Sequence, residues 1–456
     1  MIKEITIEGL RGFEAERVVK FSIPDNVNEG SGYNVIVGPN NSGKTTIIEA
    51  IKAFNGYDSP TFSIGKRNKR SSSKIKLTLT DSSNTKYEIK TVNSGGSSTV
   101  YSEKISKKYF VLPSRRHFNF EFGKATTDRD QYISQQLSNV NSRGAQLDSF
   151  YIRLFKILDN KEAFDQLLHE IIGESIEWTI DQNDSGSYYV KYSYGDLDHS
   201  SEGLGDGLWS AFTICDALYD SRDGDVIVID EPELSIHPAI QKRLLEVFCK
   251  QSKTKQIIVC THSPYFIDWK LISNGGMLSR TVKKNNHGVC VYMLTSEFRD
   301  KLNSFLKDIN NPHTLGFESK EAFFLKDNVI LVEGQEDVVI YRKIQEQLGL
   351  NLTGDFFGWG VGGAEKMEFF IKLFLDLGYD KLAIILDGDK KELFDELKKL
   401  YLDFSFYILP LQDVRDKKAI TINCKLGITN SGGILKEDYK EFIEETYQNI
   451  NSYFNE

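Results

Sequence analysis

Cysteine is scarce in this chain and scattered where it occurs. The 456 residues include five cysteines, and no two of them form a CxxC pair. A zinc ribbon requires such pairs and a disulfide framework requires an ordered set of cysteines, so the sequence argues against both classes. Scattered free thiols are typical of a protein that works in a reducing compartment.

Long apolar runs are missing as well. No segment approaches the roughly 20 apolar residues that a membrane helix needs. At the N-terminus, Lys3 and Glu4 interrupt the apolar pattern that a signal peptide would require. The sequence therefore predicts a cytoplasmic protein that has no contact with a membrane.

The chain also has no excess of positive charge. Its formal charge at pH 7 is -9, so a nucleic-acid partner would have to be held by local basic patches. Two basic clusters could form such patches, although a solvated loop or strand face is the simpler interpretation of each. The clusters are Lys66, Arg67, Lys69, Arg70, Lys74 and Lys76, and Lys104, Lys107, Lys108, Arg115 and Arg116.

The pattern of apolar residues predicts two α/β parts. A chain of 456 residues exceeds what one hydrophobic core usually covers. Residues 1–326 begin with strands and a βα unit, include a β-rich flap at about 58–110 and an inserted helical arm at about 127–172, and then return to alternating strands and helices. Residues 327–456 alternate four apolar strands with three helices, which predicts a small, mostly parallel sheet covered on both faces.

A phosphate loop follows the second predicted strand. Residues 38–45, GPNNSGKT, match the pattern GxxxxGK[ST], with an apolar strand before them and an amphipathic helix after them. In such a loop, backbone N–H groups and the helix N-terminus surround phosphates, the lysine neutralises them, and the threonine holds Mg²⁺. The residues predicted to bind ATP here are Asn40, Gly43, Lys44, Thr45 and Thr46.

Two further apolar strands end in polar residues. Asp230 and Glu231 follow the strand at 226–229; the first carboxylate can hold the metal and the second can polarise the attacking water, although such a pair can also be structural. The strand at 257–260 is followed by His262. Its position at the same sheet edge favours a functional histidine over an ordinary one.

Together these motifs resemble the ATPase of the ABC, SMC and RecF-like class. The resemblance places Walker A at 38–45, Walker B at 226–231 with Glu231 as catalytic base, and the switch histidine at His262. Residues 201–207, SEGLGDG, stand in the place of the signature motif, with Ser201 and Gly203 as nucleotide contacts, and depart from the usual LSGGQ. In this class the signature faces the nucleotide of the other subunit, so the resemblance implies a homodimer or larger oligomer formed through the ATPase domain.

Acidic residues also follow strands in the last third of the chain. Glu333 and Asp337 come after the strand at 329–332, and Asp387 and Asp389 come after the strand at 382–386. Hard carboxylate oxygens suit Mg²⁺ or Mn²⁺, and these ions support phosphodiester cleavage. A bare DxD pattern is more often a solvated surface feature, so its position in an alternating α/β domain is what favours a metal site.

EGxxD followed by DxD on this strand pattern resembles a Toprim domain. An ABC-type ATPase followed by Toprim resembles the OLD (overcoming lysogenization defect) family of nucleases. The resemblance implies that Glu333 serves as acid/base and metal ligand and that Asp387 and Asp389 hold metal. Asp337 occupies a place often filled by Glu.

A charged segment after the fourth strand is the remaining candidate. In residues 413–418, DVRDKK, Asp413 or Asp416 could hold a second metal, and Lys417 or Lys418 could stabilise the transition-state phosphate. An ordinary charged loop is the alternative.

The resemblance implies an ATP-regulated, metal-dependent DNA endonuclease or nickase of bacterial anti-phage defence. Its cofactors would be ATP and Mg²⁺, with Mn²⁺ as an option at the acidic site, and its partners would be DNA and a second copy of the chain. Some family members act beside a reverse transcriptase and its small DNA in a retron. The alternative is an SMC- or RecF-like DNA-binding scaffold ATPase with an inert Toprim domain, although long heptad arms are missing. A primase or topoisomerase is a further alternative, but the sequence lacks the tyrosine-containing or zinc-binding modules expected of those enzymes.

Overall fold

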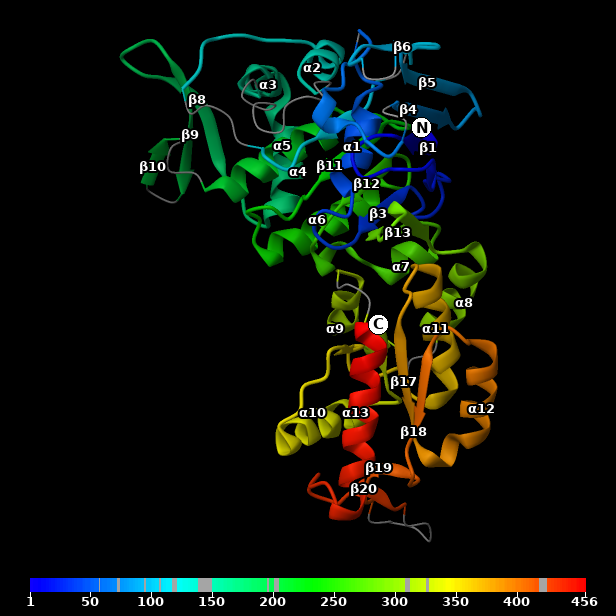
Figure 1. Ribbon diagram of the computed structural model, residues 1–456. Helices are drawn as coiled ribbons and strands as arrows, with labels where there is room; N and C mark the ends of the chain where they lie inside the picture. The colour runs from blue at the N-terminus through cyan, green and yellow to red at the C-terminus, as the bar shows by residue number, and fades with distance from the viewer. Residues whose placement is uncertain are drawn as a thin grey trace. The chain divides into compact units, whose positions relative to one another are not determined.

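The structure is a computed structural model of the chain (Figure 1). It describes residues 1–456 except 57, 72–73, 94–95, 106–107, 117–120, 138–149, 195–196, 201–204, 308–311, 325–327 and 418–424. The chain divides into two compact units, Met1–Met293 and Leu294–Glu456. Within the described ranges, none of the helices combines the length and the apolar character that crossing a bilayer would demand.

A six-stranded sheet lies at the centre of the first unit. Its strand order is β14-β13-β3-β12-β11-β7, and every neighbouring pair is parallel except β13 and β14. Strands β3, β11 and β12 are buried at every position, as expected for parallel strands covered on both faces. The strands are β3 (Tyr33–Val37), β7 (Phe110–Leu112), β11 (Val226–Asp230), β12 (Gln256–Cys260), β13 (Met277–Lys284) and β14 (Gly288–Met293).

Three long helices accompany this sheet. They are α1 (Lys44–Lys52), α5 (Asp206–Asp220) and α6 (Pro238–Gln251). Pro238 occupies the first turn of α6, where its missing N–H costs nothing, and the His237 side chain accepts a hydrogen bond from the Ala239 N–H. Helix α1 begins directly after the phosphate loop, so the sheet and this helix fix the position of the loop.

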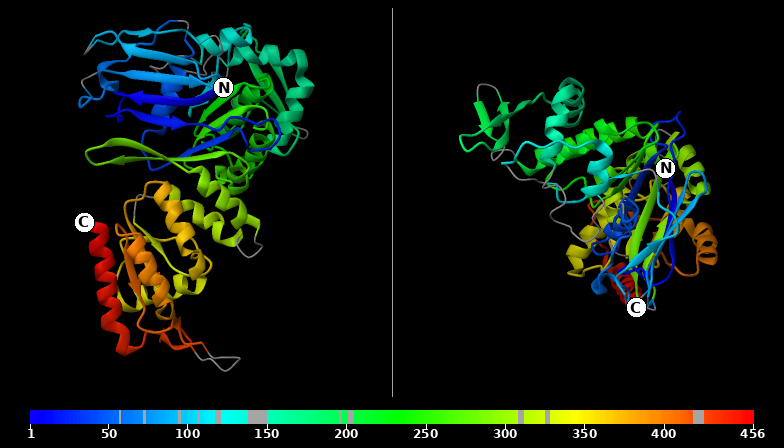
Figure 2. Two further views of the ribbon diagram at one scale, coloured as in Figure 1. Left: turned by 90° about the vertical axis from the view of Figure 1, so that its right-hand side faces the viewer. Right: turned by 90° about the horizontal axis from the view of Figure 1, so that it is seen from above.

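The predicted flap is part of a five-stranded antiparallel sheet, which the left view of Figure 2 shows at the N-terminal end of the chain. Its order is β2-β1-β4-β5-β6, and its inward positions alternate along each strand, with Ile5, Ile7, Leu77 and Leu79 fully buried. The strands are β1 (Ile2–Glu8), β2 (Arg17–Lys20), β4 (Lys76–Asp81), β5 (Lys86–Thr91) and β6 (Thr99–Tyr101).

Helices occupy the described part of the predicted arm. They are α2 (Arg129–Gln135), α3 (Tyr151–Ile157) and α4 (Lys161–Ile172). Arg153 of α3 is buried against α5, where it pairs with Asp216 and Asp220. A three-stranded antiparallel sheet follows, which the sequence analysis did not assign: β8 (Glu177–Gln182), β9 (Tyr188–Tyr194) and β10 (Leu197–Ser200).

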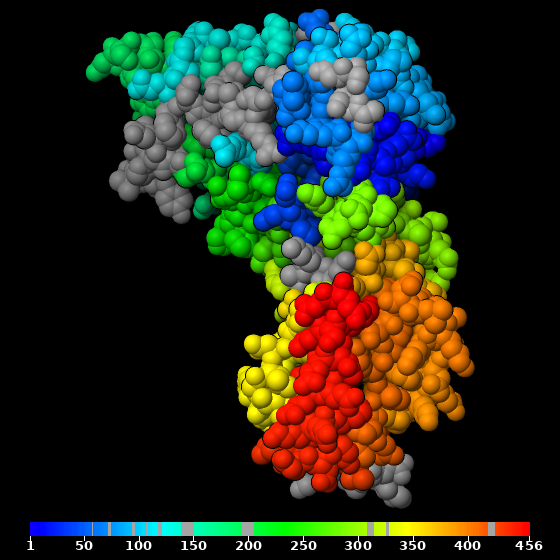
Figure 3. All heavy atoms as spheres, in the orientation of Figure 1, coloured from blue at the N-terminus to red at the C-terminus, as the bar shows by residue number. Residues whose placement is uncertain are grey.

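The second unit contains a parallel four-stranded sheet in the order β16-β15-β17-β18. Figure 1 shows α10 and α13 on one side of it and α11 and α12 on the other. Helix α13 runs along the surface of this unit in Figure 3 and buries Ile443, Tyr447 and Ile450. The elements are β15 (Val329–Leu331), α10 (Gln335–Leu348), β16 (Asp355–Phe356), α11 (Met367–Asp376), β17 (Leu382–Leu386), α12 (Lys391–Leu400), β18 (Ser405–Ile408), β19 (Asp413–Arg415), β20 (Gly427–Thr429) and α13 (Lys440–Asn455).

The contacts divide the chain earlier than the boundary predicted at 326/327. Helix α8 (Ser296–Lys307) packs on α11, where the rings of Phe298 and Phe305 stack on Phe369 at centroid distances of 4.8 and 4.4 Å. The Thr295 N–H also donates to the Asp376 carboxylate at 3.0 Å. These contacts join α8 to the second unit, which an apolar pattern along the sequence does not reveal.

Candidate functional site

The phosphate loop joins β3 to α1. Gly38, Asn41 and Gly43 have φ angles of 143°, 61° and 102°, and positive φ angles of this kind build the nests of N–H groups that bind anions. A Cβ atom at Gly38 would lie 2.2 Å from the carbonyl oxygen of Thr281. The position therefore requires glycine for space as well as for conformation.

The Lys44 ammonium lies against this loop. It donates hydrogen bonds to the carbonyl oxygens of Gly38 at 2.8 Å and Pro39 at 3.0 Å. Burial lowers the pKa of Lys44, and the nearby Cys260 and Asp230 oppose this effect. A buried cation that donates to carbonyl oxygens of the loop is well placed to neutralise a phosphate at the same loop.

The two predicted Mg²⁺ ligands of the ATP site lie together. The Asp230 carboxylate, at the end of β11, accepts a hydrogen bond from the Thr45 hydroxyl. Burial raises the pKa of Asp230 to about 7, and the charge of Glu231 adds to the rise. Its Oδ1 atom is buried and has no hydrogen-bond partner among the described residues. A cation would satisfy such an oxygen, so these residues fit a Mg²⁺ that accompanies ATP.

Glu231 and His262 face each other at the same sheet edge. Glu231 Oε1 lies 3.7 Å from His262 Nε2. Burial lowers the pKa of His262 and the charge of Lys44 lowers it further, while the charge of Glu231 opposes these effects. Glu233 holds the histidine segment, because its carboxylate accepts hydrogen bonds from the His262 N–H at 2.6 Å and the Thr261 hydroxyl at 2.7 Å.

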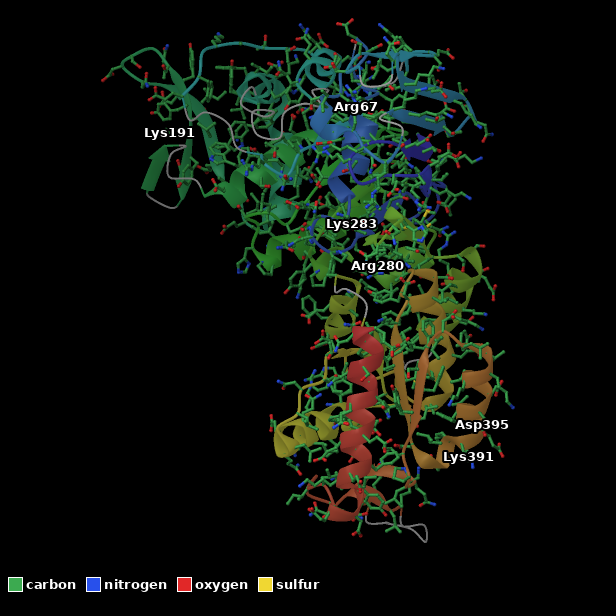
Figure 4. The ribbon with its side chains drawn as sticks, viewed as in Figure 1. Arg67, Lys191, Arg280, Lys283, Lys391 and Asp395 are labelled. Carbon is green, nitrogen blue, oxygen red and sulfur yellow. The ribbon has the colours of Figure 1, made fainter. Side chains whose placement is uncertain are left out.

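A cavity of about 1120 Å³ opens at the phosphate loop, which is large enough for a nucleotide. The predicted ATP-binding residues of the loop line it, together with Glu231 and His262. Its other walls are rich in basic side chains and come from the β1–β2 loop, the segment before β4 and the β13–β14 hairpin; Figure 4 labels Arg67 of the second and Lys283 of the third. The basic side chains of the walls are Arg11, Arg67, Lys69, Arg70, Lys283 and Lys284.

The second site lies at the carboxyl ends of β15 and β17. Glu333 Oε1 accepts a hydrogen bond from the Asp387 N–H at 2.9 Å, which ties the two strand ends together. Asp337 Oδ2 accepts from the Gly334 N–H at 2.8 Å and so caps the start of α10. Asp413, the first residue of β19, is 1% exposed.

These carboxyl groups are crowded together, so they resist ionisation. Burial, followed by the charges of Asp337 and Glu333, raises the pKa of Asp387 to about 8. Burial raises the pKa of Asp337 to about 7. The charges of Glu333 and Asp413 add to the rise, and the hydrogen bond from the Gly334 N–H opposes it. Like charges in a shared buried space resist ionisation, and a cation between them would relieve the repulsion.

Lysines pair with the outer carboxylates of the site. Lys417 Nζ lies 2.6 Å from Asp413 Oδ2, and Lys425 Nζ lies 2.7 Å from Asp389 Oδ2. Burial tends to raise the pKa of Asp389, but the Lys425 ammonium lowers it, and the net change is a lower pKa. In the part of the chain that the structure describes, no three His, Cys, Asp or Glu side chains are arranged as a complete ligand set for a metal ion.

A family model described as "AAA domain, putative AbiEii toxin, Type IV TA system" matches residues 33–268, just over half of the chain. The matched segment contains the phosphate loop, Walker B and His262. The chain belongs to this AAA-domain family. The ATPase character predicted from the sequence therefore holds at the level of the family.

Two curated relatives resemble parts of this AAA-domain protein. The OLD nuclease of Thermus scotoductus is 29% identical over 177 residues, which are 36% of this chain and 32% of the relative. The Septu protein PtuA of Bacillus thuringiensis is 25% identical over 307 residues, which are 59% of this chain and 73% of the relative. The resemblance to OLD nucleases is thus confirmed, over about a third of that nuclease's length.

Among solved structures, SMC head domains resemble the chain. The SmcHead bound to the C-winged helix domain of ScpA is 13% identical, with a TM-score of 0.43 over 66% of this chain and 99% of that chain. The Smc head domain with an extended coiled coil, bound to the C-terminal domain of ScpA derived from Pyrococcus furiosus, is 14% identical, with a TM-score of 0.44 over 67% of this chain and 99% of that chain. These values add nothing to the family assignment.

The structure groups most of the predicted site residues. Lys44, Thr45, Asp230, Glu231 and His262 meet in the AAA-domain, while the predicted acidic residues and Lys417 meet in the second unit. Ser201 and Gly203, the predicted signature contacts, lie outside the described residues. The catalytic and metal-binding roles of all these residues remain predictions.

The prediction for the basic clusters needs correction. Arg116 is 4% exposed, so it cannot form part of a nucleic-acid patch; its guanidinium donates to carbonyl oxygens of the AAA-domain instead. Arg67, 8% exposed, donates to the Phe62 carbonyl at 3.3 Å. With Lys69 and Arg70 it lines the cavity of the phosphate loop.

Sequence analysis also missed a glycine strap beside Glu333, defined as residues 358–363, GWGVGG. All four of its glycines have positive φ. The N–H groups of Gly362 and Gly363 donate to the Glu333 carbonyl oxygen at 2.9 and 2.8 Å, and a Cβ atom at Gly360 would lie 2.7 Å from the Gly334 backbone. The density of glycine was the available signal, since close backbone approach favours that residue.

Proposed function

We propose that the protein is an ATP-regulated, divalent-metal-dependent DNA endonuclease or nickase of cytoplasmic anti-phage defence. Its ATPase would lie in the first unit, Met1–Met293, and its Toprim nuclease domain would begin at about residue 327, within the second unit. The AAA-domain family supports the ATPase, and the OLD and Septu relatives support a nuclease and a role in defence. One observation carries the proposal: the carboxyl groups of Glu333, Asp337 and Asp387 gather at the strand ends of a parallel sheet, where burial raises the pKa of each and the charge of Glu333 adds to the rise at Asp337 and Asp387.

The donor chemistry of the acidic site suits a hard divalent cation. Carboxylate oxygens at strand ends favour Mg²⁺ or Mn²⁺, and the crowded negative charge resembles that of sites where an ion is needed to balance it. Glu333, Asp387 and Asp389 would hold the ion, with Asp337 and Asp413 nearby. When bound, the ion would supply Lewis-acid activation of water and charge neutralisation at a phosphodiester.

The residues of the chain would perform the other tasks. Glu333 is oriented by the Asp387 N–H and by the strap that binds its carbonyl, so its carboxylate has a fixed position for accepting a proton from water. Lys417 and Lys425 carry positive charge beside the carboxylates. A phosphate would attract these ammonium groups and thereby release carboxylate oxygens for the ion.

The ATPase would regulate this site as a dimer. Lys44, Thr45 and Asp230 would hold Mg²⁺ and ATP, Glu231 would activate water, and Ser201 and Gly203 would contact the nucleotide of a second copy. A retron partner, a reverse transcriptase with its small DNA, is a further proposal that derives from the OLD resemblance.

A DNA-binding scaffold ATPase with an inert Toprim domain is the second candidate. The observation that favours it is the pairing of Asp389 and Asp413 with lysines, together with the lack of a complete metal-ligand set in the described chain. The two candidates differ in whether Mn²⁺ binds at Asp387 and in whether DNA is cut.

Plasmid cleavage decides between them. Purified protein is incubated with supercoiled plasmid and Mg²⁺ or Mn²⁺, with and without ATP, and Mn²⁺ binding is measured by calorimetry. We expect nicking by the wild type and a loss of at least about 100-fold for Asp387→Asn, which keeps the size of the side chain. Asp395→Asn is the matched control, because Asp395 lies on the exposed face of α12 (Figure 4).

Three results would contradict the nuclease. These are an uncut plasmid in every metal, undiminished nicking by Asp387→Asn, and equal Mn²⁺ binding by Asp387→Asn and wild type. ATP hydrolysis without cleavage would favour the scaffold ATPase.

A further inference from the structure

Arg116 makes four hydrogen bonds beside the ATPase site, and none of the roles described above belongs to it. Its side chain follows β7 and is 4% exposed. Nη1 donates to the carbonyl oxygens of Pro113 at 2.8 Å and Asp230 at 2.7 Å, and Nη2 donates to the carbonyl oxygen of Glu231 at 2.7 Å. Nε donates to Ser210 Oγ at 2.6 Å. One guanidinium thus connects three segments that are far apart in the sequence.

The backbone that Arg116 holds is unusual. Glu231 has a φ angle of 48°, a left-handed conformation that costs a residue with a side chain about 1 kcal/mol. Its N–H donates to the Cys260 carbonyl oxygen on β12 at 2.7 Å. Arg116 binds the carbonyl oxygens on both sides of that residue. The two peptide planes that flank Glu231 are therefore fixed, and they set the direction in which its side chain leaves the backbone.

That direction decides where the carboxylate lies. Glu231 lines the cavity of the phosphate loop with His262, whose Nε2 is 3.7 Å from Glu231 Oε1. A change in either peptide plane would rotate the Cα–Cβ bond and move the carboxylate. Because a shift of about 1 Å can cost about 100-fold in rate, a group that fixes these planes acts on catalysis without touching the nucleotide.

The fourth contact leads to α5. Ser210 lies in the second turn of this helix, which begins at Asp206, within the segment 201–207 that stands in the place of the signature motif. The hydrogen bond from Arg116 Nε therefore connects the start of α5 to the carboxyl end of β11. A displacement of α5 along its axis would pull on the group that holds Glu231.

We infer that Arg116 is a positioning residue for ATP hydrolysis: it fixes the left-handed peptide of Glu231 and links that peptide to the start of α5. The inference rests on the ATPase part of the proposed function. Arg116 would hold the backbone that carries the water-activating carboxylate and would not itself contact the nucleotide.

The chemistry of the side chain fits this role. Only a planar guanidinium can direct donors to four acceptors at once, whereas a lysine ammonium is a point charge with three donors. Burial lowers the pKa of Arg116 to about 10, with Glu233 and Asp230 opposing, so the group stays charged at neutral pH. Nearby carboxylates compensate the positive charge of Arg116, while its N–H groups donate to carbonyl oxygens and to the Ser210 hydroxyl.

Kinetics of a conservative variant test the inference. Arg116→Lys is expected to lower kcat for ATP hydrolysis by about 100-fold and to change the Kd for ATP by less than about threefold. Ser210→Ala, which removes one acceptor and leaves the guanidinium in place, is expected to lower kcat by about threefold to tenfold. Arg115→Lys is the matched control, because this neighbour is exposed, and wild-type rates are expected for it.

A double variant shows whether Arg116 acts through Glu231. In single-turnover hydrolysis, Arg116→Lys should cause no further loss in a Glu231→Gln background, because the group it positions is gone. Three results would overturn the inference. They are a double variant whose rate loss is the product of the two single losses, a wild-type kcat for Arg116→Lys, and a Kd for ATP that rises as much as kcat falls.

Amide hydrogen exchange tests the same point without turnover. In the nucleotide-free protein, Arg116→Lys should increase exchange in residues 229–236 by at least about tenfold relative to the Arg115→Lys control. Unchanged exchange would overturn the inference, even if the wild type hydrolysed no ATP. Failure of the proposed ATPase and failure of this inference are thereby distinguished.

Discussion

The pairing of Lys425 with Asp389 allows a quantitative test of the acidic site. The two groups lie 2.7 Å apart, with side-chain exposures of 41% for the lysine and 24% for the aspartate. If a divalent ion binds Asp389, it must compete with this ammonium. Replacing Lys425 with Met removes the competitor and keeps most of the aliphatic stem.

The exposure of the pair sets the size of the effect. A solvent-exposed ion pair contributes about 1 kcal/mol or less, which corresponds to at most about a fivefold change in an equilibrium constant. We therefore expect Lys425→Met to tighten Mn²⁺ binding by up to about fivefold. The free energy of unfolding without metal should fall by no more than about 1 kcal/mol, because neither group becomes buried and unpaired.

Calorimetric titration with Mn²⁺ measures the first quantity and urea unfolding measures the second. Lys391→Met is the matched control, since Lys391 lies exposed on α12 (Figure 4). It should leave both quantities unchanged. Weaker Mn²⁺ binding by Lys425→Met, or a gain that Lys391→Met reproduces, would refute the competition between lysine and metal.

Two further predictions concern the first unit. Gly38→Ala should weaken ATP binding at least tenfold and lower the free energy of unfolding by about 1–3 kcal/mol, because the new Cβ meets the Thr281 carbonyl at a φ of 143°. Fluorescent-nucleotide titration and thermal unfolding measure the two effects, with Gly123→Ala as the control. Equal behaviour of the two variants would contradict the loop geometry. Burial raises the pKa of Asp216 to about 6, with Arg153 opposing, so its contribution to stability is fully present below about pH 4 and is lost as the pH rises through 6. Relative to wild type, Asp216→Asn should therefore gain up to about 3 kcal/mol of unfolding free energy between pH 4 and pH 7, and a loss over that range would contradict the assignment.

The sequence predicted the central sheets because their strands are apolar and short. Parallel strands buried on both faces produce continuous apolar runs, as in β3, β11 and β12, and the alternating elements of the second unit follow the same rule. The hairpin of β8 and β9 escaped assignment, since few of its residues are buried. The contacts of α8 with α11 could not be inferred either, because stacked rings such as those of Phe305 and Phe369 join segments that have no relation along the sequence.

The structure brings predicted site residues together where a motif puts a particular side chain at a strand end. Lys44, Asp230 and Glu231 belong to motifs with fixed spacing, so their grouping followed from the order of the strands. Arg116 and Glu233 escaped because their task is to hold backbone: one donates to carbonyl oxygens and the other accepts from N–H groups. Many residue types can provide such contacts from many positions, so no spacing identifies them.

The same distinction explains the error about the basic clusters. A basic cluster in a sequence consists of residues that are neighbours along the chain, whereas a basic surface patch requires residues that are neighbours in space and exposed. Arg115 and Arg116 are adjacent in sequence, yet the first is exposed and the second is buried behind Walker B. The acidic site shows the reverse case, in which Asp389 and Lys425 are distant in sequence and paired in space. Charge counted along a chain therefore bounds the net field of the molecule, while only the fold decides which charges a nucleotide or a phosphodiester would meet.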